Sequence, residues 1–219
     1  MKMKINSIIL FIFLSSFVFS QEKDSQTWST LSIDKKIVKK TEMTLKQSFR
    51  LENNSSFLYK YFTDSRIKYN YNKMLSVSIG FRYINEREIE NNWLADTNTE
   101  NKNRYYSDLH VKQNIDRFKL SLRNRLQKQG VKNDFNNTFR QKLSIDYNIK
   151  KSKLKPIFST EYFYKKEEKI IKIRYSLGLE YPVIKNLNFY LGYRFQKEVN
   201  VSDPLELKIF EVKINYNLK

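Results

Sequence analysis

Residues 187–196 read LNFYLGYRFQ, and apolar and polar side chains alternate along the whole stretch. Residues 75–83, LSVSIGFRY, repeat this alternation. Successive side chains of a β-strand point to opposite faces, so each stretch predicts a strand with one apolar and one polar face. Because the apolar face reaches both strand ends, it needs apolar surroundings outside the sheet. Lipid provides them, and the pattern predicts a transmembrane β-barrel with a polar interior.

The same alternation recurs along most of the chain. It predicts strands near residues 27–35, 41–52, 57–71, 74–85, 104–115, 118–129, 137–149, 154–165, 170–181, 187–198 and 206–218. Short connections are expected at 72–73, 116–117, 150–153 and 182–186, and longer polar ones at 53–56, 86–103, 130–136, 166–169 and 199–205. The two classes alternate strictly, as in outer-membrane barrels, whose short turns are periplasmic and whose long loops are extracellular.

The strand count depends on the segment around Trp28. Ten strands counted back from the C-terminus begin and end on the periplasmic side, and the Trp28 segment is an eleventh. Bacterial single-chain barrels favour even numbers. Either this segment lies against or inside the barrel, or two strands are merged and the total is twelve. The expected fold is therefore all-β, an antiparallel outer-membrane β-barrel of 10 to 12 strands.

The N-terminus has the pattern of an export signal. Lys2 and Lys4 precede a short apolar run from Ile8 to Val18, and a small-residue cleavage site ends at Ser20. The run is too short for a membrane-spanning helix, which needs about 20 apolar residues. We expect residues 1–20 to be a signal peptide, residues 21–219 to form one barrel domain, and the mature protein to reside in the outer membrane of a Gram-negative bacterium.

The chain is strongly basic, with 41 Lys and Arg against 23 Asp and Glu among 219 residues. Loss of the signal peptide lowers the net charge from +18 to +16, because it removes Lys2 and Lys4. In a protein that is not exported, this charge would favour nucleic acid. Export excludes that partner and points to outer-membrane lipid, lipopolysaccharide phosphates or an electropositive lumen. Lysines on solvent-exposed faces account for part of the excess of positive charge.

Charged residues of both signs occupy the polar face. The candidate lumen network comprises Arg82, Asp108, His110, Glu161, Arg174, Glu180 and Arg194, and the same face carries Asp64, Arg123, Arg125 and Asp146. Narrow barrels fill their interior with side chains, so mixed charges favour a filled lumen with a structural or binding role. The alternative is a narrow, anion-preferring pore or transporter. Gly80, Gly178 and Gly192 share this face and predict the close approach of a large inward side chain such as Tyr190.

An enzymatic function would have to use His110, the single histidine of the sequence. An Asp108–His110 pair that activates a Ser is the hydrolase alternative. Outer-membrane lipid hydrolases resemble one another in carrying Ser two residues after His, whereas this sequence carries Lys112 there. We therefore expect no catalytic residue. One His and no Cys are also too few for an ordinary transition-metal site, and no cofactor is expected.

Several short motifs resemble an outer-membrane barrel family known as domain of unknown function 2490. They are Trp28, Ser48-Phe49-Arg50, Gly80-Phe81-Arg82-Tyr83, Ser159-Thr160-Glu161 after Pro156, Gly192-Tyr193-Arg194-Phe195 and Ile214-Asn215-Tyr216. The resemblance spans nearly the whole mature chain and implies a membrane barrel without an established activity. It implies no catalytic residue. The chain ends in Leu218-Lys219 where barrels commonly end in an aromatic residue, although Tyr216 lies two residues earlier on the same face.

Overall fold

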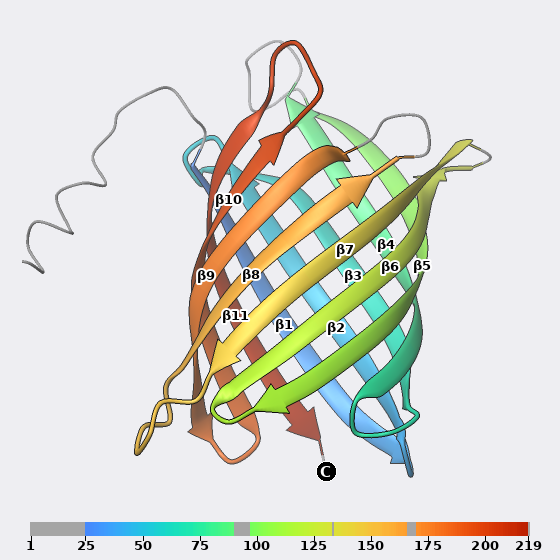
Figure 1. Ribbon diagram of the computed structural model, residues 1–219. Coiled ribbons are helices and arrows are strands. Elements are labelled where there is room, and N and C mark those ends of the chain that lie inside the picture. Colours follow the sequence, from blue (N-terminus) through green and yellow to red (C-terminus); the bar gives the residue numbers. More distant parts are fainter. Residues whose placement is uncertain (1–24, 90–96, 133, 166–169, 219) are drawn as a thin grey trace, which may run out of the picture.

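The computed structural model describes residues 25–89, 97–132, 134–165 and 170–218, which form eleven β-strands. The strands are β1 Ser25–Val38, β2 Thr41–Glu52, β3 Phe57–Asn70, β4 Leu75–Ile89, β5 Thr97–Ile115, β6 Phe118–Val131, β7 Asp134–Tyr147, β8 Lys155–Tyr164, β9 Ile170–Ile184, β10 Leu187–Glu198 and β11 Glu206–Leu218. Each pairs with its neighbours in sequence, and β1 pairs with β11, which closes the barrel (Figure 1). The all-β barrel prediction is confirmed. Among the described residues, no helix is long and apolar enough to cross a membrane.

The barrel closes through one parallel pair of strands. Strand β1 runs beside β11 from the pair Ser25–Lys208 to the pair Lys35–Leu218, whereas all other neighbours are antiparallel. Parallel closure follows from the odd number, because an up-and-down meander reverses direction at every strand and the first and eleventh strands then run the same way. The two expectations for the Trp28 segment were wrong. It lies neither against nor inside the barrel and does not raise the total to twelve, since it is a full strand of the wall.

The connections alternate less strictly than the sequence indicates. The connection between β6 and β7 is only residues 132–133, because both strands extend into the expected loop at 130–136. Residues 97–103, expected in the longest loop, belong to β5. At the opposite end of the barrel, β7 and β8 are joined by residues 148–154, longer than the expected short turn. Polar residues at strand ends explain the first two errors, because they pair in the ladder although their composition is that of a loop.

The two faces of the wall differ sharply in chemistry. Large apolar side chains point outward and stay exposed, as for Ile79, Leu126 and Leu177, which are 62–65% exposed. Charged side chains point inward and are buried, as for Asp64 and Asp108, which are 2% and 3% exposed. This is the reverse of a water-soluble fold and is the arrangement of a barrel surrounded by lipid.

Glycines on the inner face make room for tyrosines. Gly178 and Gly192 are paired across β9 and β10, and the Tyr190 ring covers both. A Cβ atom on Gly192 would lie 2.7 Å from two ring atoms of Tyr190, and one on Gly178 would lie 2.6 Å from a third. Gly80 meets the Tyr106 ring in the same way. The predicted close approach of Tyr190 is confirmed, and the interior at this level is tightly packed.

Replacing Gly192 by Leu should destabilise the barrel by about 1–3 kcal/mol, because the added side chain must displace the Tyr190 ring from a packed interior. Urea unfolding of the refolded protein, followed by its gel shift on boiling, measures the change. The double variant Gly192→Leu/Tyr190→Ala is the control and should recover part of the loss. Unchanged stability of Gly192→Leu would contradict the packing described above.

Candidate functional site

A girdle of six arginines and four aromatic rings lines the barrel interior. It consists of Trp28, Arg50, Phe62, Arg82, Tyr106, Arg125, Arg140, Phe163, Arg174 and Arg194, one residue from each of β1 to β10. The guanidinium carbons lie 3.7–5.5 Å from the ring centroids. The four aromatic side chains are only 4–7% exposed. Stacking of this kind fixes the plane of each guanidinium and excludes water from its face.

Trp28 lies close to three arginines, more than any other ring of the girdle. Arg50 stacks on it with the guanidinium carbon 3.7 Å from the centroid, and Arg174 and Arg194 lie 5.5 and 5.1 Å away. The indole N–H donates to Gln26 Oε1 at 3.0 Å, and the Tyr59 hydroxyl donates to the same oxygen at 3.2 Å. These bonds hold the indole in place as a common platform for three cations.

One buried carboxylate, Glu161, faces several arginines at once. Arg140 donates to Glu161 Oε1 at 2.8 Å, Arg123 binds the same oxygen, and Arg174 Nη1 lies 3.5 Å from Oε2. Lys142 is its direct neighbour across β7 and β8. Glu161 is 5% exposed, so its charge is essential to compensate cations that water solvates poorly.

Two further carboxylates tie the girdle to strands β3, β4 and β5. Asp64 accepts from Arg82 Nε and from the Tyr106 hydroxyl, both at 2.8 Å. Asp108 accepts two bonds from Arg125, at 2.6 and 2.8 Å. Charge-assisted bonds with this fork geometry are among the strongest in proteins. Together they make the middle of the lumen a continuous polar network.

The structure places most of the candidate lumen network in or beside the girdle. Arg82, Arg174 and Arg194 belong to it, and Asp108, His110 and Glu161 bind or adjoin its arginines. Arg194 forms its ion pair with Glu211 at 3.0 Å. Glu180 is separate: it pairs with Lys155 near the β7–β8 connection, and both side chains are partly exposed. It is not part of the buried cluster.

Sequence reasoning missed three central residues, which are Arg50, Arg140 and Glu211. Alternation alone places Arg50 and Arg140 on the inner face, beside the buried Ser48 and Ser144. For Glu211 the signal is weaker, because its inner-face neighbours Leu207 and Ile209 are apolar and buried next to Trp28. That apolar cluster makes the two faces of β11 look alike in sequence.

The hydrolase alternative gains no support from the geometry. His110 Nε2 lies 3.6 Å from Asp108 Oδ2 and, among the described residues, has no hydrogen-bond partner. Ser76 is its neighbour across β4 and β5, but no hydrogen bond joins the two side chains in the described part of the chain. Asp108 is occupied by Arg125, and all these groups face the lumen, where the wall separates them from membrane lipid.

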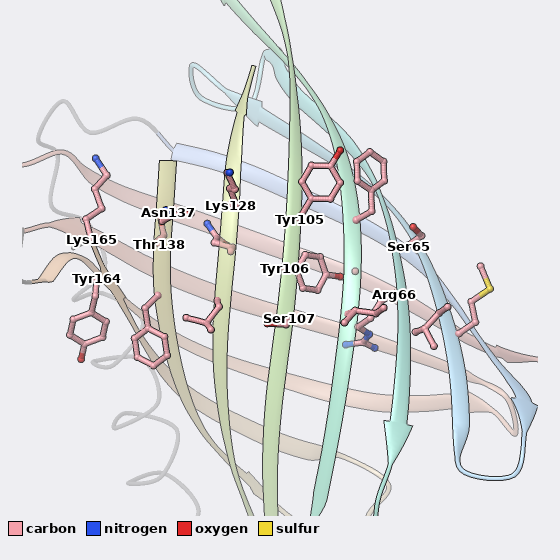
Figure 2. A pocket seen from close by; sticks show the side chains of 18 residues that line it. Ser65, Arg66, Tyr105, Tyr106, Ser107, Lys128, Asn137, Thr138, Tyr164 and Lys165 are labelled. Carbon is pink, nitrogen blue, oxygen red and sulfur yellow. The ribbon is translucent and has the colours of Figure 1, made fainter. Parts of the chain in front are cut away.

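A groove of about 910 Å³ crosses the outer wall from β2 to β8 (Figure 2). Exposed apolar side chains such as Met43, Ile67 and Leu126 line it, and the short side chains of Ser65 and Ser107 form part of its floor. These residues point away from the lumen. The groove opens on the outer face of the wall, although Arg66 and Tyr106 of the inner face also border it.

The fold and its interior define a class, the outer-membrane barrels with a charged, side-chain-lined lumen. The family described as "Protein of unknown function (DUF2490)" matches residues 25–204, and the chain belongs to this family. The resemblance noted in the sequence is thus confirmed. No curated protein matches the sequence.

The solved structures that match this chain include porins. The chain superimposes on the NanC porin with a TM-score of 0.51 and 11% identity over 78% of this chain and 86% of that one. A KdgM porin in complex with disordered oligogalacturonate gives 0.45 and 16%, covering 76% and 86%. An anion-selective porin from Comamonas acidovorans gives 0.42 and 13%, covering 82% and 54%. At these identities, the similarity to the NanC porin shows a shared fold.

Proposed function

We propose that this protein acts in the outer membrane as a filled-lumen barrel with a structural or binding role. The observation that carries this proposal is the girdle, whose four aromatic rings are at most 7% exposed. A wide water-filled channel at that level would leave the rings and the guanidinium groups open to solvent. Outer-membrane lipid is the partner of the outer wall, and anionic headgroups such as those of lipopolysaccharide suit the net positive charge of the chain.

A narrow, anion-preferring pore is the second candidate, and the charge of the interior favours it. Lys46, Arg66, Arg104 and Lys142 lie on the inner face. Within the described residues, none of them has a carboxylate inside ion-pair distance, although Arg66 donates to Thr44 and Arg104 to Gln129. Rings of uncompensated cations attract anions and exclude cations.

Planar-bilayer conductance separates the two candidates. The refolded mature protein should show little or no steady current if the girdle fills the lumen. Gly192→Leu should then lower stability and leave the current unchanged. A large anion current that falls in a stable Gly192→Leu variant would overturn the filled-lumen proposal and establish the pore.

The enzymatic alternative is tested by lipid analysis of a deletion strain. We expect the outer-membrane phospholipids and lipid A to keep their acylation pattern, because no serine is hydrogen-bonded to His110 Nε2 among the described residues. A reproducible change in acylation, restored by the wild-type gene and not by a His110→Ala variant, would contradict this expectation.

Export provides a further prediction. Mass spectrometry of the mature protein should place its N-terminus at Gln21, and the protein should sediment with outer membranes and migrate differently on gels before and after boiling. The reason is the combination of the signal-like segment 1–20 with a barrel whose outer face is apolar. Recovery of the protein in the soluble periplasm would refute the membrane assignment.

A further inference from the structure

We propose that the Trp28 platform is an oxyanion-binding site for a carboxylate- or phosphate-bearing solute in the half of the lumen where β1 begins. The proposal rests on the filled-lumen binding role proposed above and names the chemistry of its ligand. The site consists of Trp28 and the three guanidinium groups of Arg50, Arg174 and Arg194. All four residues lie within a few positions of the strand ends at one mouth of the barrel.

The local charge is not balanced by the protein. Glu161 faces Arg123, Arg140 and Arg174, while Glu211 faces Arg194 and Lys213. Arg50 has no carboxylate within ion-pair distance among the described residues, so six cations share two carboxylates. Charges withdrawn from water need partners, and a bound anion supplies the missing negative charge.

Arg50 is the centre of the site because its hydrogen-bonding edge is incomplete. Its face is covered by Trp28, with the guanidinium carbon 3.7 Å from the ring centroid. Its Nε atom is buried and has no hydrogen-bond partner in the described part of the chain. By contrast, Arg174 Nε donates to Gln196 and Arg194 Nε to Ser176. A stacked guanidinium presents its N–H groups only in its own plane, where carboxylate and phosphate oxygens fit in pairs.

The platform also explains why the first strand carries a tryptophan. Trp28 and Arg50 are direct neighbours across β1 and β2, and β11 contributes Leu207 and Ile209 behind the indole. Closure of the barrel by β1 therefore brings the ring from one side of the seam to arginines of β9 and β10 on the other. The site exists only in the closed barrel.

The test uses the full mature protein, refolded in detergent micelles, with Trp93→Phe so that Trp28 is the single tryptophan. Sodium phosphate and sodium acetate are titrated separately against sodium chloride at constant ionic strength, and Trp28 fluorescence and the thermal unfolding midpoint are followed. We expect a saturable fluorescence change and a rising midpoint with an oxyanion and neither with chloride. The comparison of phosphate with acetate identifies which oxyanion the site prefers.

Arg50→Met should raise the half-saturating concentration at least tenfold. Arg117→Met is the matched control, because it removes the same charge from an exposed turn at the opposite mouth, and it should bind like the parent. The gel shift on boiling verifies that each variant is folded. If Arg50→Met does not fold, Arg50→Lys replaces it as the test variant. The lysine keeps the positive charge but lacks the paired N–H donors of the guanidinium group, so this variant should bind the oxyanion several-fold more weakly.

Three results would overturn the site: equal responses to chloride and to the oxyanions, unchanged binding by folded Arg50 variants, or no response of a folded barrel. Each of them is compatible with a low conductance and so leaves the filled-lumen role standing. A large conductance together with an Arg50-dependent oxyanion response would instead refute the filled lumen and keep the site.

Discussion

Glu161→Ala should lower the free energy of unfolding by about 3–5 kcal/mol, because removal of one partner from a buried ion-pair cluster leaves the others uncompensated. Glu161 is 5% exposed and binds Arg140, Arg123 and Arg174, so three guanidinium groups lose their shared counter-ion. Urea titration of the refolded protein in liposomes measures the loss.

The control for this variant is Glu100→Ala. Glu100 forms an ion pair with Lys102, but the Glu100 side chain is 51% exposed. Removal of this carboxylate should therefore change the free energy of unfolding by no more than about 0.5 kcal/mol. Equal effects of the two substitutions would show that the interior is as well hydrated as the rim. The girdle would then be a water-lined constriction instead of a filled section.

Leu177→Arg should cost about 2–4 kcal/mol in lipid, because it places a charge on the outer face near the bilayer midplane. Leu177 is the central residue of β9 and is 62% exposed. Val183→Arg is the matched control: Val183 lies on the same face of the same strand near its end, where the expected cost falls to about 0–1 kcal/mol. Equal tolerance at both positions would mean that this face does not contact the hydrocarbon core.

The inner neighbour Ser176 is unsuitable as a mild comparison. The sequence suggests that an arginine at Ser176 is tolerated if the lumen has room for it. Ser176 is 7% exposed and accepts a hydrogen bond from Arg194 Nε at 3.0 Å. An added arginine would meet a cation in a packed space, and Ser176→Arg should also destabilise the fold.

The fold was predictable because alternation is a local property of each strand. The apolar face of β10 follows directly from Leu187 to Phe195, and the close approach of the inward Tyr190 follows from the glycines beside it. Closure was not predictable, since nothing in residues 25–38 specifies a parallel partner 183 residues away. Whether a segment joins the barrel wall as a strand depends on the curvature of all eleven strands together.

The site was only partly predictable for a similar reason. Inward orientation follows from sequence for Arg82 and Arg174, but the choice of counter-ion depends on the stagger between strands. Glu161 reaches Arg123, which lies two strands away on β6. Arg140 faces inward by the same alternation, but its bonds to Gln127 of β6 and Glu161 of β8 depend on this stagger.

The odd number of strands also determines how the polypeptide crosses the bilayer. Strand β1 begins at the mouth where β2 and β3 are connected, and β11 ends at the opposite mouth, near the connection between β9 and β10 (Figure 1). A barrel with an even number of strands returns both chain ends to the same compartment. Here the two ends of the barrel domain open into different compartments, so a label at the start of β1 and a label at the end of β11 report on opposite sides of the membrane.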